Sequence, residues 1–191
     1  MVELNESLTA KNLMLLLAIE TQTIQKYSWF AKQAKKDGFE QMAAFFLEVA
    51  EQKKSHTKTI FRFLESISVE TNYTLAVPPI GVTLDNLRQA ALSESNEADK
   101  LYAQFEQAAW DEGFKQIATK LKLFGQIKLF YTQRFNILAD NIINDRVFLR
   151  EKKVKWICRK CGLIYESERA LKKCPGCEHP QAYFEILAEN Y

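Results

Sequence analysis

The sequence predicts an all-α four-helix bundle followed by a small metal-binding domain of short strands and loops. Three observations support this fold class. Residues 7–143 divide into long helical segments separated by glycine- and proline-containing breaks. Two helical hairpins within that region repeat each other, and all four cysteines lie beyond it, near the C-terminus. We therefore expect residues 1–146 to form the bundle and residues 147–191 the cysteine domain.

The helices follow from the positions of the breaks. The first and third are expected to end at Gly38 and Gly113, and Pro78 and Pro79 interrupt any helix between the two hairpins. A helix of about thirty residues is about 45 Å long. Two short-looped hairpins of that length, joined by one long crossover, describe an antiparallel four-helix bundle. The expected helices cover residues 7–37, 39–66, 83–113 and 114–143.

A shift of 75 residues aligns the two hairpins. The matched pairs are Tyr27 with Tyr102, Phe30 with Phe105, Ala34 with Ala109, Gly38 with Gly113, Phe39 with Phe114, Gln41 with Gln116 and Ala43 with Ala118. The bundle is therefore expected to be a duplicated hairpin with pseudo-twofold symmetry, and both hairpins turn at a Gly-Phe junction. The same shift places Lys128 on Lys53 and Tyr131 on His56.

The four cysteines form two C-x-x-C pairs, Cys158 with Cys161 and Cys174 with Cys177, separated by twelve residues. Two such knuckles form a tetrahedral four-thiolate cage for one metal ion. The N-terminus lacks the pattern of a secretory signal, so disulfides are not expected. Iron and zinc both accept four thiolates, so the spacing predicts a metal site and leaves the metal open.

Charge and hydropathy exclude several classes of partner. The chain carries 26 basic and 24 acidic residues, which gives no reason to expect binding to nucleic acid or to an anionic membrane. The longest apolar run, residues 13–19, is far too short to span a bilayer. A cytoplasmic protein is expected.

Within the bundle, polar residues recur three positions apart, a spacing that places both members of a pair on one helix face. Bundles that hold two irons use one Glu from each of two helices and Glu-x-x-His from each of the other two. Here the corresponding elements are altered to Lys53-Lys-Ser-His56 and Lys128-Leu-Phe-Tyr131. The full candidate set comprises Glu20, Lys53, His56, Glu94, Glu97, Lys128 and Tyr131.

The whole chain resembles the rubrerythrin family, in which a ferritin-like bundle precedes a rubredoxin-like iron domain. Further support comes from residues 34–39, 61–65 and 146–151. The resemblance implies a non-haem iron peroxidase that reduces hydrogen peroxide, with electrons passing from the four-cysteine iron to a di-iron centre. It also implies a redox partner protein, and a homodimer that brings one subunit's cysteine domain close to the other's bundle.

The resemblance also identifies what is missing. The family's ligands are matched at Glu20, His56, Glu94 and Glu97. Its two bridging glutamates fall at Lys53 and Lys128, and its second histidine falls at Tyr131. Three carboxylates with two ammonium groups carry the same net charge as five carboxylates with two ferrous ions. We therefore hypothesise that the lysines replace the metals, because buried charges need partners, and that the di-iron centre is absent.

Three functions follow from these observations. The first, which we favour, is an electron-transfer protein with one iron in the cysteine cage and no di-iron centre. The second is a peroxidase whose remaining bundle ligands still hold metal. The third is a non-catalytic structural or regulatory protein with zinc in the cage.

Overall fold

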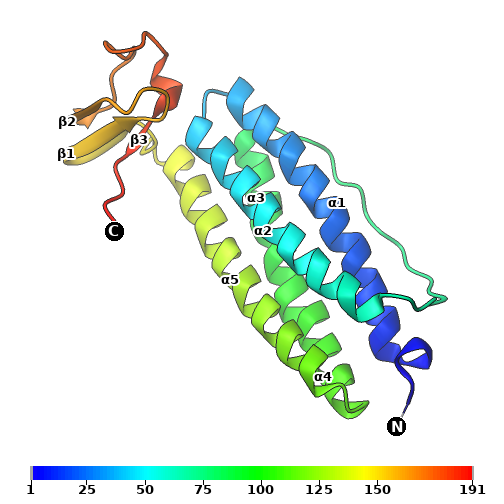
Figure 1. Cartoon of the computed structure of the whole chain (residues 1–191). Coiled ribbons are helices and arrows are strands. Elements are labelled where there is room, and N and C mark those ends of the chain that lie inside the picture. Colours follow the sequence, from blue (N-terminus) through cyan, green and yellow to red (C-terminus); the bar gives the residue numbers. More distant parts are fainter. Residues whose placement is uncertain (1, 191) are drawn as a thin grey trace.

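The computed structural model describes residues 2–190 and shows a long four-helix bundle with a small three-stranded sheet at one end (Figure 1). The predicted fold class is confirmed. The chain begins with a short 3-10 turn, η1, over Leu4–Glu6. The bundle helices are α1 (Leu8–Lys36), α2 (Glu40–Leu64), α3 (Thr83–Asn96), the π-helical segment η2 (Glu97–Tyr102), α4 (Ala103–Asp111) and α5 (Lys115–Ile143).

The two hairpin turns have the same geometry. Gly38 and Gly113 have φ angles of +85° and +87°, the left-handed region that favours glycine. In each turn the following phenylalanine donates its backbone N–H to a carbonyl five residues earlier, at 2.8 Å in both cases. Each Gly-Phe junction therefore ends one helix and sets the direction of the next, as the repeat predicts.

The third helix is not the uninterrupted helix that the sequence predicts. It is built from α3, the π segment η2 and α4, which follow one another without a break in the chain. Glu20 and Glu94 are 74 residues apart, whereas Tyr27 and Tyr102 are 75 apart. The second hairpin thus carries one extra residue between its glutamate and its tyrosine. A π turn accommodates one inserted residue within a helix, so Glu94 rather than Ser95 is the structural counterpart of Glu20.

Each hairpin turn also caps the first helix of the other hairpin. Asp37 accepts hydrogen bonds from the backbone N–H of Thr83 at 2.8 Å and from its hydroxyl at 2.6 Å. Glu112 accepts from the backbone N–H groups of Leu8 and Thr9 at 2.9 and 2.8 Å, and from the Thr9 hydroxyl at 2.6 Å. The carboxylates satisfy N–H groups that have no partner within their own helices, so the caps connect the two halves of the bundle.

We expect Asp37→Ala to lower the free energy of unfolding by about 0.5–2 kcal/mol, the usual cost of losing a helix cap. Burial raises the pKa of the Asp37 carboxyl, but hydrogen bonds from Thr83 outweigh this effect and lower it. The cap therefore contributes fully above the unfolded-state pKa of about 3.9 and is lost as the pH falls through the lower folded-state pKa. Urea denaturation at neutral and acidic pH measures both effects. Asp140→Ala, an exposed change on α5, is the control. An equal loss of unfolding free energy in both variants would contradict the capping role of Asp37.

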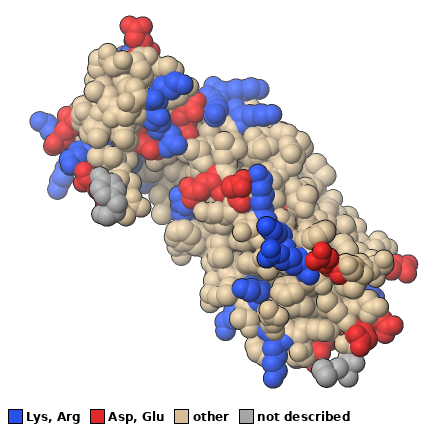
Figure 2. Space-filling view, viewed as in Figure 1, with Lys and Arg blue, Asp and Glu red and all other residues tan. Residues whose placement is uncertain are grey.

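Two apolar clusters fill the bundle. One lies toward the sheet and includes Phe30, Phe46 and Phe135, while the other lies toward the N-terminus and includes Leu13 and Leu121. A layer of buried charged side chains accompanies these clusters. Within residues 2–190, no helix combines the length and apolar character that crossing a membrane requires. On the face visible in Figure 2, acidic and basic side chains are interspersed over the bundle.

The small sheet has the order β2-β1-β3, with antiparallel pairing throughout. Its strands are β1 (Leu149–Cys158), β2 (Ile164–Arg169) and β3 (Phe184–Ile186). Trp156 and Phe184 are buried beneath it, and Phe39 of the bundle stacks on Phe148 with ring centroids 6.2 Å apart. The predicted boundary between residues 146 and 147 falls in the connection between α5 and β1, and we propose it as the domain boundary.

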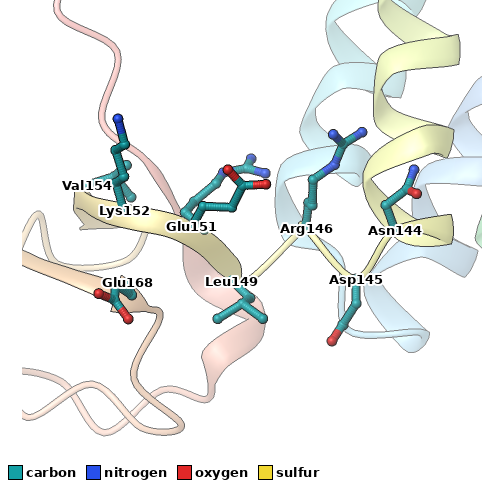
Figure 3. Close-up of a pocket in the computed structure, with 9 residues that line it drawn as sticks. Asn144, Asp145, Arg146, Leu149, Glu151, Lys152, Val154 and Glu168 are labelled. Atoms are coloured by element: carbon teal, nitrogen blue, oxygen red, sulfur yellow. The ribbon is translucent and has the colours of Figure 1, made fainter.

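An open hollow of about 790 Å³ lies where α5 leads into β1 (Figure 3). Acidic and basic side chains line it in equal number, three of each: Asp145, Arg146, Arg150, Glu151, Lys152 and Glu168. Because neither sign of charge prevails, the hollow offers no evident anion or cation site.

Candidate functional site

The four cysteines come together between the knuckle loops of the small domain. Their sulfur atoms all lie within 4.8 Å of one another. In the first knuckle, Gly162 donates its N–H to the Cys158 carbonyl at 2.8 Å, and in the second Glu178 donates to the Cys174 carbonyl at the same distance. Gly162 and Glu178 have φ angles of +77° and +63°. The second knuckle thus holds a non-glycine residue in the left-handed region, where glycine is favoured.

Backbone N–H groups surround the sulfurs. They donate from Leu163 to Cys161, from Gly176 and Cys177 to Cys174, and from His179 to Cys177. Such donors favour the thiolate form that binds metal. The Nδ1 atom of His179 donates to the Cys177 backbone carbonyl at 3.0 Å. This atom is therefore not directed at the four sulfurs. Four soft sulfur ligands with N–H support fit one tetrahedral iron or zinc ion. Within residues 2–190, this is the one group of His, Cys, Asp and Glu ligand atoms close enough to hold a metal ion.

The second candidate site is a buried group of five charged side chains in the bundle, which we call the ion cluster: Glu20, Lys53, Glu94, Glu97 and Lys128. Lys53 Nζ lies 2.9 Å from Glu20 Oε2 and 2.9 and 3.0 Å from the two oxygens of Glu94. Lys128 Nζ lies 2.6 Å from Glu20 Oε1, 3.0 Å from Glu94 Oε2 and 2.6 Å from Glu97 Oε2. Glu20 and Glu94 each bridge the two ammonium groups, as carboxylates bridge paired metals.

Two tyrosines complete the ion cluster and follow the symmetry of the repeat. Tyr27 of the first hairpin donates to Glu94 of the second at 2.6 Å. Tyr102 of the second hairpin donates to Glu20 of the first at 2.7 Å. Both rings are buried. Ammonium and phenol donors together leave the two central carboxylates fully hydrogen-bonded, as buried charges require.

The electrostatics favour the ionised forms. Burial alone raises the pKa of the Glu20 carboxyl, but Lys128 and Lys53 outweigh it and hold the pKa well below its usual range. The same two lysines lower the pKa of Glu94 against the effect of burial. Burial lowers the pKa of Lys128, but the three glutamates more than reverse this and raise it. Glu20, Glu94 and Lys128 are therefore charged at neutral pH.

His56 and Tyr131 lie outside these contacts. The His56 ring stacks on Phe124 with centroids 4.4 Å apart, and its buried Nδ1 has no hydrogen-bond partner among the described residues. Burial lowers the pKa of His56 to about 4, so the ring is neutral. The centroid of the Tyr131 ring lies 5.6 Å from Lys53 Nζ. The sequence places both residues beside the site, and the structure shows them as packing groups beside the ion cluster.

Sequence reasoning missed one charged neighbour, Lys26 on α1. It is 9% exposed, and its ammonium lies 5.7 Å from the centroid of the Tyr27 ring. Burial lowers its pKa, while attraction to Glu97 and Glu94 acts in the opposite direction. With Lys26 included, three cations face three carboxylates, which removes the net negative charge counted from the sequence. The sequence gives no sign of this role for Lys26, because the 75-residue shift aligns it with the apolar residue Leu101.

Comparison with known proteins identifies the family. Residues 11–126 match the family model described as rubrerythrin, and residues 156–185 match that of the rubrerythrin rubredoxin-like domain. The chain belongs to the rubrerythrin family. It is 40% identical over 193 residues to a rubrerythrin of Porphyromonas gingivalis, covering 99% of this chain and 96% of the relative. It is 39% identical over 194 residues to the rubrerythrin of Nitratidesulfovibrio vulgaris, with both chains fully covered.

Solved structures agree on the fold. Nigerythrin in a mixed-valence state superimposes with a TM-score of 0.62 at 24% identity, covering 98% of this chain and 94% of that one. Membership of the rubrerythrin family, together with a four-cysteine site arranged to bind a metal, supports an iron-binding redox protein.

Proposed function

We propose that this rubrerythrin family member transfers single electrons through one iron in the cysteine cage and that its bundle has lost the di-iron centre. The observation that carries the proposal is the ion cluster. Lys53 and Lys128 occupy the centre of the site with Nζ–O distances of 2.6–3.0 Å. An ammonium group repels a metal cation, and each of the three carboxylates already binds at least one. The residues of the ion cluster therefore do not fit a pair of irons, and the proposed electron transfer uses no di-iron centre.

The cage itself fits the proposed chemistry. A four-thiolate iron supplies a single electron by cycling between ferric and ferrous forms. The chain's contribution is to hold four sulfurs in one geometry and to surround them with N–H donors, which favour the added negative charge of the reduced state. Trp156 and Phe184 are buried beside the cage and limit water on that side. A fixed geometry allows the electron to enter and leave with little rearrangement.

The alternatives rest on other features. A peroxidase would need Glu20, His56, Glu94 and Glu97 to hold metal, yet the three carboxylates engage ammonium or hydroxyl donors and His56 stacks on Phe124. A zinc protein would use the same four cysteines. By relation to the family, we also propose a redox partner protein and a homodimer.

Metal content by element, measured on protein produced with iron supplied, tests the proposal. We expect one iron per chain, a red ferric-thiolate colour that bleaches on reduction, and little peroxide reduction even when an artificial donor keeps the iron reduced. The control is a Cys158→Ser and Cys174→Ser double variant, which should lose the colour and keep the helical circular dichroism. Colourless protein with one zinc would support the structural alternative, and two further irons per chain would support the peroxidase.

A further inference from the structure

The cysteine domain contacts the bundle at the first hairpin turn, where α1 ends and α2 begins (Figure 1). The rings of Phe39 and Phe148 stack there, with their planes 8° apart. The 3-10 turn η3, Gln181–Tyr183, packs directly on the same turn, since a Cβ added at Gly38 would lie 3.9 Å from the Ala182 Cβ. The two domains therefore meet at a defined surface, in addition to the chain that connects them.

The second hairpin turn has the same backbone geometry but lies at the opposite end of the bundle (Figure 1). A Cβ added at Gly113 would meet none of the described residues within 4 Å. Gly113 and Lys115 are exposed, whereas their counterparts Gly38 and Glu40 are half-buried. Because the repeat has lysine where the first turn has Glu40, forming the turn does not require a carboxylate at this position. Glu40 is therefore a feature of the turn that contacts the cysteine domain.

Glu40 faces the cysteine domain. Its side chain is 17% exposed, although its one ion pair among the described residues, with Lys35, has an N–O separation of 4.0 Å. The Tyr183 hydroxyl donates to the Glu40 carboxylate, whose charge raises the pKa of this phenol. A carboxylate that is largely covered needs hydrogen-bond donors, and Tyr183 is the donor that the cysteine domain supplies.

Tyr183 also contacts both knuckles. Its carbonyl accepts the backbone N–H of Arg159, the residue after Cys158, at 2.8 Å. Its ring lies edge-on to the ring of His179, with centroids 4.7 Å apart. The backbone N–H of His179 in turn donates to the Cys177 sulfur. One residue thus connects a carboxylate of the bundle to the backbone that holds the four sulfurs.

We propose that Glu40 and Tyr183 form a latch that holds the cysteine domain on the first hairpin turn, with Tyr183 positioning both knuckles against the bundle. The latch should also respond to the charge of the cage. Reduction adds one electron to the ferric site and therefore one negative charge, which repels the Glu40 carboxylate. The closed latch should favour the ferric form, and reduction should weaken the latch, since such coupling is reciprocal. Only this redox consequence rests on the proposed electron-transfer function.

The latch is tested on full-length protein loaded with zinc, which is diamagnetic and accepts the same four thiolates. Nitrogen-15 relaxation in nuclear magnetic resonance measures the rotational correlation time of each domain. In the unmodified chain we expect both domains to share one value. Glu40→Ala and Tyr183→Phe should each shorten the correlation time of residues 147–191. Ala182→Arg should shorten it further, because it places a long side chain against Gly38.

Matched changes at exposed positions, Glu51→Ala, Tyr73→Phe and Ala188→Arg, should leave the two domains with their shared correlation time. Joint tumbling of both domains in all three latch variants would overturn the proposal. Equal release of the cysteine domain in the matched variants would also overturn it, because release would then not depend on the contact between Glu40 and Tyr183.

The coupling to the cage is tested on iron-loaded protein by spectroelectrochemistry. Glu40→Gln removes the charge and keeps an acceptor for Tyr183. It should raise the ferrous-to-ferric ratio at a fixed potential by about twofold or more, the effect of one unit charge at about 10 Å in water. Tyr183→Phe should act in the same direction. The double variant should shift the ratio no further than the larger single change, because the two residues act as one unit.

Glu51→Gln is the matched control and should leave the ratio unchanged. An unchanged or lowered ratio in Glu40→Gln, or fully additive shifts in the double variant, would overturn the coupling between the latch and the cage. If the zinc form releases its cysteine domain as expected while the iron form does not cycle, the latch stands and the proposed electron transfer fails.

Discussion

Lys128→Met should lower the free energy of unfolding by about 3–5 kcal/mol near neutral pH, the usual cost of removing one partner from a buried charge pair. Lys128 and its carboxylate partners Glu20 and Glu94 are fully buried. Without this ammonium, Glu20 and Glu94 keep Lys53 as their one contacting ammonium, and Glu97 loses its ion pair. Methionine fills the space without supplying a donor. Guanidinium denaturation followed by helical circular dichroism measures the loss. Lys122→Met, an exposed change on the same helix, should cost less than about 0.5 kcal/mol.

The loss should shrink as the pH falls. In the unmodified protein the pKa values of Glu20 and Glu94 are lowered, so their ion pairs contribute stability above the unfolded-state pKa and lose it on acidification. In the variant the unpaired carboxyls have raised pKa values, take up protons on folding and gain stability as the pH falls. The difference between the two proteins should therefore narrow below about pH 5. A constant difference from neutral to acidic pH would show that lost packing rather than charge explains the effect.

If Lys128→Met alone fails to fold, the double variant with Glu94→Gln supplies the test. It removes one charge of each sign and keeps an amide that can accept from Tyr27. We expect it to be more stable than Lys128→Met, because the two residues share one network and their effects are not additive. A double variant as unstable as the sum of its single changes would mean that the two side chains act independently.

Much of this architecture is readable from the sequence because it is local or repeated. The Gly-Phe junctions, the four helical segments and the two C-x-x-C knuckles depend on residues close together in the chain. The 75-residue repeat then brings Lys53 and Lys128 to equivalent places in the two hairpins. The sequence prediction fails for features that a single 75-residue shift does not reveal. The π segment is one of them, because it reflects one extra residue in the second hairpin.

The remaining misses have the same origin. Asp37 and Glu112 are structural counterparts separated by 75 residues, yet their capping role depends on how one hairpin lies against the other. The counterpart of Lys26 in the repeat is Leu101, so the repeat does not mark this lysine, and its burial near Glu97 and Glu94 depends on how the helices pack. His56 shows the limit for side chains. Its spacing places it on the site's face, but the aromatic partner at Phe124 decides what the ring contacts.

Restoring three residues together should return metal to the bundle. The variant Lys53→Glu, Lys128→Glu and Tyr131→His recreates the two Glu-x-x-His elements that bundles use to hold two irons. Without metal, five buried carboxylates would repel one another, so we expect the apo variant to be several kcal/mol less stable than the unmodified chain. Ferrous iron should reverse much of that loss, since a ligand that binds only the folded state stabilises it. Anaerobic elemental analysis should find about two irons per chain beyond the one in the cage.

The parts of the site that the three changes leave alone are already in place for such a recovery. Tyr27 and Tyr102 hold Glu94 and Glu20 at 2.6 and 2.7 Å, and the Nδ1 atom of His56 has no partner among the described residues. Single reversions should recover less, because each leaves a lysine or lacks a ligand. A surface control, Lys54→Glu, Lys122→Glu and Tyr73→His, makes the same changes in composition at exposed positions and should take up no extra iron. Some peroxide reduction should accompany iron uptake in the triple variant. Equal iron content and equal peroxide turnover in the unmodified chain would show that Lys53 and Lys128 do not block the site, and the peroxidase function would then replace the one proposed.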